Sequence, residues 1–346
     1  MGPMSSSPIG SERVAYDSSR RSKVTGFGYN EATLAADIRH ALESLNWEKC
    51  IKSDSKVFVK PNFALPFYKP GVTTTESVIE ATLGILKDRA SEVYVGESDG
   101  GADSFTADYS LRNHGIPEMC RRTGATMLNL SAGQRKRIKE VVNGRAVEVT
   151  LPSQLLEMDE SISIPVLKVH AVTQVSLSLK NMWGCHPDGM RLFDHKHLPE
   201  RLALISKLVH LRFVVVDAIY GLNRRGPMHG DPVRVGAILV GDNPVATDAT
   251  ATRMIGFRPH EVRHIVMASK YGLGPYQDSD IELLGDLTPF QQKFYLKSTL
   301  VDVLGAWTFR SDYLTKLVFD SSISRLIYVL TGRKFRKKIA KLGDEL

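Results

Sequence analysis

Hydrophobic positions along the chain change repeatedly from helical spacing to strand-like runs. Helical spacing, with apolar residues three or four positions apart, predicts helices over residues 30–45, 73–86, 105–122, 200–211 and 244–255. Short runs rich in β-branched residues predict strands over residues 56–59, 92–96, 126–130, 145–151, 162–169, 213–219 and 235–240. Because strands and helices alternate, we predict an α/β fold with a mixed, mostly parallel sheet covered by helices.

Polar residues indicate where several of these helices begin. Asn30 and Asp242 are predicted N-caps, and Thr73 with Glu76 has the spacing of a capping box. Asp248 lies among small residues of the helix predicted over 244–255. Small side chains allow close packing, so we expect Asp248 to be buried together with a partner.

The chain is predicted to have three parts: a flexible leader over residues 1–12, an α/β domain over 13–285 and a helical, basic extension over 286–346. Within the extension, an apolar face between Leu314 and Leu330 precedes a basic cluster between Arg333 and Lys341. Such a segment can pack on the domain, mediate homo-oligomer formation or lie on an anionic membrane surface. We favour packing, because most apolar helix faces belong to a core.

Composition excludes several classes of protein. Hydrophobic residues make up 42% and charged residues 24% of the 346 residues, which is ordinary for a globular protein. No apolar run approaches the roughly 20 residues of a membrane-spanning helix, and residues 1–10 lack the apolar centre of a secretory signal. Three widely spaced cysteines exclude a disulfide scaffold, so we predict a cytoplasmic location. The net charge of +7 is concentrated near the C-terminus without interleaved aromatic residues, and we therefore expect no nucleic-acid partner.

Candidate reactive side chains gather between residues 168 and 230, which hold six of the ten histidines. Lys168 and His170 end a predicted buried strand and are two residues apart, so both should point to one face of the sheet. Asp217 ends another predicted strand. Because ligand sites of α/β sheets commonly lie at the carboxyl ends of strands, these groups are candidates for acid–base chemistry. The competing interpretation is a solvated loop whose histidines are unrelated in space.

Histidine spacing also leaves a metal site open. His195 and His197 would face one ion if their segment were extended, and His170 could complete a site for a transition metal. The sequence contains no HExxH helix and no C-x-x-C pair, so it supplies ligand types without a diagnostic geometry.

A second pattern suggests anion recognition. The loop around Arg225, Gly226, His229 and Gly230 joins cations to glycines that allow close approach of a backbone to a ligand. Two further candidate anion-binding segments are Lys60–Asn62 and the start of the predicted 244–255 helix. In the alternative interpretation these glycines only form turns. Neither a P-loop nor a GxGxxG motif supports nucleotide binding.

Five short motifs occur together in a recognisable order. They are VKPN at 59–62, PVLKVH at 165–170, LKNMWG at 179–184, VDAI at 216–219 with Gly226, Pro227 and Gly230, and DNPVATDA at 242–249. In this order the chain resembles DUF362 domain proteins over roughly residues 13 to 275. Many relatives carry ferredoxin-like modules with cysteine-ligated clusters. The chain lacks the necessary cysteines, so we expect no intrinsic iron–sulfur cluster.

The resemblance implies an architecture and a set of site residues rather than a reaction. The family pattern falls on Lys60, Asn62, Lys168, His170, Lys180, Asn181, Asp217, Gly226, Gly230, Asp242 and Asp248. We assign catalytic roles to Lys168, His170, Lys180 and Asp217. Substrate-binding roles go to Lys60, Asn62, Asn181, Arg225, Gly226, His229 and Gly230, and the metal candidates are His170, His195 and His197.

Together these features predict an enzyme acting on a small anionic or carbonyl-bearing metabolite. Its reaction would be a redox or isomerisation step, with a metal or organic cofactor left open. The alternative is a non-catalytic ligand- or metal-binding or maturation protein, associated with a membrane surface through its C-terminal helices.

Overall fold

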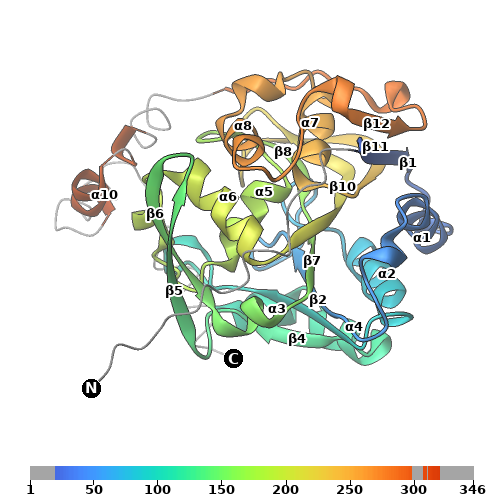
Figure 1. The fold of residues 1–346 in the computed structure, drawn as a ribbon, viewed down its shortest axis with the longest axis horizontal. Helices are drawn as coiled ribbons and strands as arrows, with labels where there is room; N and C mark the ends of the chain where they lie inside the picture. Colours follow the sequence, from blue (N-terminus) through green and yellow to red (C-terminus); the bar gives the residue numbers. More distant parts are fainter. Residues whose placement is uncertain (1–19, 298–306, 310, 320–346) are drawn as a thin grey trace.

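The computed structural model describes residues 20–297, 307–309 and 311–319, and these residues form an α/β fold around one large sheet (Figure 1). The strands are β1 (Ser22–Gly28), β2 (Lys56–Pro61), β3 (Glu92–Glu97), β4 (Thr126–Asn129), β5 (Arg135–Val142), β6 (Arg145–Pro152), β7 (Glu160–Ile164), β8 (Val166–His170), β9 (Gln174–Ser176), β10 (Leu211–Asn223), β11 (Asp231–Gly241) and β12 (Ile281–Leu284). The predicted leader, the basic cluster and most of the predicted extension lie outside the described residues.

Strand order in the sheet is β12-β1-β11-β10-β7-β2-β3-β4, with β8 paired to β10 and to β9. The pairs β10–β7, β7–β2, β2–β3 and β3–β4 are parallel, whereas β11 is antiparallel to both of its neighbours. The predicted mixed, mostly parallel sheet is therefore confirmed. A separate hairpin of β5 and β6 packs beside it.

Helices cover both faces of the sheet. The α-helices are α1 (Leu34–Ser44), α2 (Glu76–Lys87), α3 (Ala107–Asn113), α4 (Ile116–Thr123), α5 (Ser178–Asn181), α6 (Leu198–Leu208), α7 (Pro244–Met254), α8 (Arg263–Lys270) and α10 (Asp312–Phe319). Short 3-10 helices are η1 (Trp47–Lys49), η2 (Gly101–Asp103), η3 (Ser153–Glu157), η4 (Met182–Cys185), η5 (Arg191–Asp194), η6 (Pro259–Glu261), η7 (Asp278–Asp280) and η8 (Thr288–Phe290). Helices α1, α2 and α4 lie on one side in Figure 1, and α5, α6 and α8 lie on the other.

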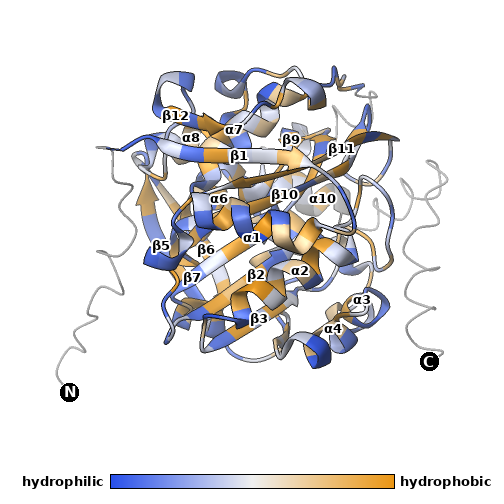
Figure 2. Ribbon diagram, turned by 90° about the vertical axis from the view of Figure 1, so that its right-hand side faces the viewer, coloured by the Kyte–Doolittle hydropathy of each residue, from blue (hydrophilic) through white to orange (hydrophobic). Residues whose placement is uncertain are grey.

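Alternation along the central strands builds two separate hydrophobic cores. Val57 and Val59 of β2 pack with α1 and α2, whereas Phe58 between them faces the core beneath α5 to α8. The same alternation occurs in β10, where Val214 and Val215 belong to different cores. Hydropathy colours in Figure 2 show hydrophobic residues concentrated in these strands. Both faces of the sheet are covered, as is typical of parallel strands with continuous apolar runs.

Two predicted elements are interrupted in the structure. The helix predicted over 105–122 is divided into α3 and α4 at Gly115, whose φ of 67° is left-handed and ends the first helix. The strand predicted over 162–169 becomes β7 and β8, which separate at Pro165 because proline has no N–H to donate to the ladder.

Helix starts differ from the predicted caps. Asn243, not Asp242, caps α7, and its Oδ1 accepts hydrogen bonds from the N–H groups of Val245 and Ala246 at 3.0 and 3.1 Å. Asp242 instead accepts from the Lys23 N–H at 2.9 Å. The predicted capping box is also wrong.

Helix α2 starts at Glu76, and its capping group comes from a distant strand. The Asp217 carboxylate accepts from the Thr75 N–H at 2.7 Å and from the Ile219 N–H at 3.1 Å. Thr33 occupies the N-cap position of α1, so the predicted Asn30 cap is replaced as well. Among the described residues, no helix is both long and apolar enough to cross a bilayer.

We predict that replacing Asp217 by Asn lowers the free energy of unfolding by about 1–3 kcal/mol, because a buried N–H loses its carboxylate acceptor. Urea denaturation followed by circular dichroism measures this change. The control is Asp286→Asn, an exposed aspartate that accepts from the Thr288 N–H at 2.8 Å, where we expect a change below about 0.5 kcal/mol. Equal effects of the two substitutions would contradict the assigned role.

Candidate active site

A cavity of about 420 Å³ opens at the carboxyl edge of the sheet. Its walls come from segments that follow β2 and β3, from β8, and from the chain between α5 and η5. Polar lining residues are Asn62, Glu97, Ser104, Lys168, His170, Ser176, Lys180, Asn181, Arg191 and His195. Aromatic and apolar lining residues include Phe63, Leu65, Phe105, Trp183, Met228 and Phe309. The structure therefore gathers five predicted catalytic or substrate-binding residues around one space, together with His195, which was predicted as a metal ligand only.

The four-residue helix α5 supplies one wall and is fixed at both ends by buried polar groups. At its start, the Asp248 carboxylate accepts hydrogen bonds from the N–H and Oγ of Ser178 at 2.9 and 2.6 Å, and from the Leu179 N–H at 3.0 Å. The prediction that Asp248 is buried with a partner is confirmed, although the partners are hydrogen-bond donors rather than a cation. Burial raises the pKa of Asp248 to about 7.

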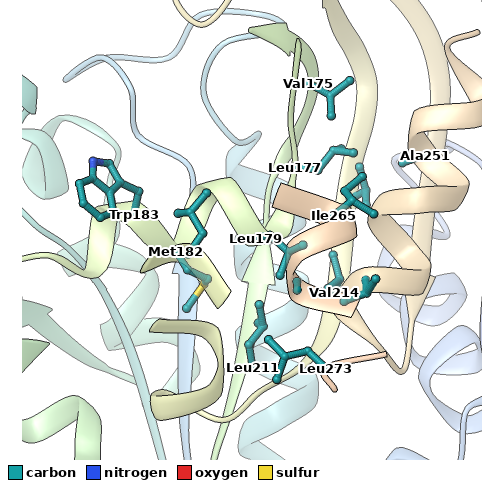
Figure 3. Close-up of a cluster of buried hydrophobic side chains, with 14 of the residues drawn as sticks. Val175, Leu177, Leu179, Met182, Trp183, Leu211, Val214, Ala251, Ile265 and Leu273 are labelled. Atoms are coloured by element: carbon teal, nitrogen blue, oxygen red, sulfur yellow. The ribbon is translucent and has the colours of Figure 1, made fainter. Parts of the chain in front are cut away.

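At the other end of α5, the side-chain amide of Asn181 forms hydrogen bonds with β2, with β7 and with the segment that follows β2. Its Nδ2 donates to the carbonyl oxygen of Lys60 and to Oγ of Ser163, both at 3.0 Å, and its Oδ1 accepts from Nδ2 of Asn62 at 2.9 Å. Leu177, Leu179 and Met182 anchor the same segment in the core (Figure 3). These contacts fix the backbone on both sides of Lys180.

Beneath the cavity lies a buried ion pair between Lys60 and Glu97. Nζ of Lys60 donates to Glu97 Oε2 and to the carbonyl oxygen of Pro61, the latter at 2.8 Å. Glu97 also accepts from the Ser98 N–H at 3.0 Å. Lys60 is fully enclosed and absent from the cavity lining, and its charge is paired with Glu97 at the base of the cavity.

Asn62 connects Asn181 to Lys168 through side-chain hydrogen bonds. Nζ of Lys168 donates to Asn62 Oδ1 at 2.5 Å and to the carbonyl oxygen of Val72 at 2.8 Å. Burial, and then the charge of Lys180, lower the pKa of Lys168 to about 7. Two protein acceptors thus hold the amine in place at the cavity wall.

His170 and His195 present complementary nitrogen atoms. Nδ1 of His170 accepts from the Val172 N–H at 3.1 Å, so the neutral ring carries its proton on Nε2. Nδ1 of His195 lies 3.0 Å from the carbonyl oxygen of Leu192 and donates to it, which leaves Nε2 as an acceptor. Burial and then the charge of Lys180 lower the pKa of His170 well below its usual value and that of His195 to about 3. Both imidazoles are therefore neutral near pH 7.

Lys180 differs from the other lysine of the cavity lining, Lys168, in its contacts. Its side chain lines the cavity, and within the described part of the chain its Nζ has no hydrogen-bond or ion-pair partner. Burial and then the nearby Arg191 charge lower the pKa of Lys180 to about 7. A lowered pKa favours the uncharged form of the amine, and an uncharged amine is a base and a nucleophile.

The charge balance of the cavity favours an anion. Glu97 is the only carboxylate among the described lining residues, and Lys60 neutralises it. Arg191 faces the cavity while one of its nitrogen atoms donates to the carbonyl oxygens of Asp99 and Asp188 at 2.7 and 3.2 Å. The guanidinium is thereby fixed in place, and its planar set of donors suits a carboxylate or phosphate.

Several predicted site residues lie outside this cavity. The Asp217 carboxylate accepts from the Thr75 N–H at the start of α2 and lies outside the cavity lining. Arg225, Gly226, His229 and Gly230 are also absent from the lining, to which their loop contributes Pro227 and Met228 instead. Gly226 has a packing role, because a Cβ atom there would lie 1.6 Å from the Val169 carbonyl oxygen. The start of α7, predicted to bind an anion, is satisfied internally by Asn243.

The predicted histidine metal site does not form. Among the described residues there is no group of three or more His, Cys, Asp or Glu side chains that could hold a metal ion. His197 adopts a left-handed conformation, with φ of 59°, at the start of α6, so the segment is not extended as the prediction requires. Its Nδ1 lies 2.6 Å from the Arg145 guanidinium, and it lines a neighbouring cavity of about 500 Å³ rather than the one with His170.

Sequence reasoning gave no role to two contributors to the cavity, Arg191 and Trp183. Both lie within the segment recognised as rich in functional groups, but neither matched a ligand or catalytic pattern. Glu97 ends β3 and lines the cavity as well. His114 supports the site from behind, stacked on Phe63 with ring centroids 3.8 Å apart.

The fold and this cavity define an α/β protein with a cationic pocket at the carboxyl edge of its sheet. The family model described as "Domain of unknown function (DUF362)" matches residues 57–253, more than half of the chain, and the protein belongs to this family. A curated relative, the thylakoid-associated protein sll1697 of Synechocystis sp., is 24% identical over 258 residues, which cover 71% of this chain and 78% of the relative.

Among solved structures, the lactate racemase apoprotein from Thermoanaerobacterium thermosaccharolyticum is similar, with a TM-score of 0.45 and 10% sequence identity. The alignment covers 72% of this chain and 61% of that protein, less than two thirds of its length. Similarity at this level transfers neither a reaction nor a ligand.

We predict that Gly184→Ala destabilises the protein by about 1–3 kcal/mol, because the added Cβ would lie 2.7 Å from Glu97 Oε1 and 3.0 Å from Lys60 Nζ. Chemical denaturation gives the measurement. Gly84→Ala in the interior of α2 is the matched control, since nothing lies within 4 Å of its Cβ, and it should stabilise by about 0.5–1 kcal/mol. A neutral Gly184→Ala variant would disprove the tight packing around the ion pair.

Competitive labelling of amines with acetic anhydride across a pH series should give Lys180 a titration midpoint near pH 7, as its lowered pKa of about 7 requires. Exposed Lys52 is the reference amine in the same reaction. Mass spectrometry of peptides resolves the two sites. A midpoint for Lys180 equal to that of Lys52 would show that the amine is solvated and ordinary.

Proposed function

We propose that the protein is an enzyme that binds a small, carbonyl-bearing anion in this cavity and catalyses proton transfer at the carbon next to the carbonyl. The observation that carries the proposal is the unpartnered Lys180 amine facing the same space as two neutral imidazoles and a fixed guanidinium. A substrate carboxylate would pair with Arg191. Its carbonyl oxygen would accept from Nε2–H of His170.

Proton transfer next to a carbonyl requires a base and a donor that stabilises the developing negative charge. Lys180 has a pKa near the working pH, which is the condition for efficient transfer. His170 is held in its donor tautomer by the Val172 N–H and lies in a largely buried position, where a hydrogen bond to an oxyanion is stronger than in water. Nε2 of His195 is an acceptor for a substrate hydroxyl group.

The choice between an isomerisation and a redox reaction depends on which of them the cavity side chains can catalyse without a cofactor. Amine and imidazole groups move protons, and the described cavity residues support that step directly. A redox reaction through an added cofactor remains the second prediction from the sequence. The isomerising step is the one we propose.

For cellular location we propose the cytoplasm, in line with free cysteines at Cys50, Cys120 and Cys185. The name of the cyanobacterial relative associates that protein with thylakoids. Membrane-surface attachment of this chain through its basic C-terminal segment is therefore the alternative. Fractionation of cells that express either the full chain or a chain without residues 310–346 decides between the two locations. Sedimentation with membranes of the full chain alone would favour attachment.

Exchange of substrate protons tests the proposed function. In deuterated water, the protein should catalyse loss of the proton signal next to the carbonyl in at least one member of a panel of small α-keto and α-hydroxy acids, followed by NMR. His170→Gln and Arg191→Met should each lower the exchange rate by about 10²-fold or more, because they remove the oxyanion donor and the anion contact.

His260→Gln is the matched control, since this histidine is 61% exposed and lies outside the cavity lining. It should retain the full exchange rate. Calorimetric binding of panel members without any exchange would identify a non-catalytic binding protein and refute the enzymatic proposal.

A further inference from the structure

Lys180 combines three properties that are rarely found together at a protein surface. It reaches a cavity, its Nζ has no partner among the described residues, and the charge that acts on it is that of Arg191, since the lining carboxylate Glu97 is paired with Lys60. A lysine that only stabilised the fold would be expected to pair with an acceptor, as Lys60 and Lys168 do. The contrast separates two structural lysines from one that is available for chemistry.

We propose that Lys180 acts by covalent catalysis and forms an imine with the carbonyl carbon of its substrate. The proposal rests on the proposed function and specifies its substrate class as aldehydes or ketones that carry a neighbouring carboxylate or other anionic group. The alternative within that function is direct removal of a proton by the same amine.

Imine formation uses two groups of the cavity and one proton from solvent. The Nζ lone pair attacks the carbonyl carbon, and the electron pair of the C=O bond moves to oxygen, which accepts a hydrogen bond from Nε2–H of His170. The attacking nitrogen then passes a proton to this oxygen, which gives the neutral carbinolamine. A proton from solvent converts the carbinolamine hydroxyl group into water, which leaves, and the product is a positively charged iminium ion. Overall, amine, carbonyl and one proton give iminium and water.

The contacts of the cavity also orient the substrate so that its carbonyl carbon would lie next to Nζ of Lys180. Arg191 is fixed by two backbone carbonyl groups and can orient the anionic end of the substrate. Asp248 and Asn181 fix the two ends of α5, so the backbone that carries Lys180 is held in place. The iminium carries the positive charge that acidifies the neighbouring C–H bond, which links this step to proton transfer.

Reductive trapping tests the proposal on the full-length wild-type protein. Glyoxylate and pyruvate are the probes, sodium cyanoborohydride reduces any imine to a stable secondary amine, and peptide mass spectrometry at pH 7 locates the product. We expect Lys180 to be modified at least tenfold faster than exposed Lys52. Lys180→Met and Lys180→Arg should abolish this label, whereas Lys52→Met should leave it unchanged.

The outcomes separate the two proposals. Modification of Lys180 no faster than Lys52 overturns the imine, and so does preferential modification of Lys168. If proton exchange still occurs in the wild type and is lost in Lys180→Arg, the enzyme stands and Lys180 acts as a direct base. If circular dichroism shows that the variants are misfolded, the wild-type labelling ratio alone decides.

Discussion

The structure depends on satisfying buried polar groups at the two ends of α5. A helix of four residues contributes almost no stability of its own, because too few internal hydrogen bonds compensate for the ordering of its backbone. Asp248 from α7 and Asn181 at the junction with β2 and β7 supply the missing contacts. Removal of either side chain would leave buried donors without acceptors, or acceptors without donors, and the cavity wall would lose its position.

This arrangement explains the pattern of short motifs in the sequence. The LKN segment carries Lys180 and Asn181, the DNPVATDA segment carries Asp248, and the VKPN segment carries the Asn62 amide that contacts Asn181. Segments distant along the chain thus meet in one hydrogen-bonded network. Most of the motif residues position one another, and only a few, chiefly Lys180 and His170, face the cavity with a free nitrogen atom.

The sequence predicted the fold better than the site, for physical reasons. Buried strands can be recognised in the sequence by apolar runs such as that of β10. Strand β5 was not predicted, because it is largely exposed and rich in charged residues. Lys168 and His170 were placed correctly because strand alternation fixes their direction. Asp217 lies in the middle of β10 rather than at the end of a strand, and its carboxylate meets the N–H of Thr75 outside the cavity lining. The length of β10 could not be predicted from its apolar run alone. The histidine site failed because its geometry depends on a turn at His197 that no periodicity reveals.

The lowered pKa values of the two cavity lysines also make the stability of the protein depend on pH. Lys168 and Lys180 have pKa values of about 7 in the folded protein, against an ordinary value of 10.5. Between pH 7 and pH 10.5 the unfolded chain therefore binds more protons at these positions than the native protein, so their contribution to stability falls as the pH is lowered through this range. An uncharged amine is what nucleophilic and basic chemistry require, so the destabilisation is a direct consequence of the reactivity that we propose for Lys180.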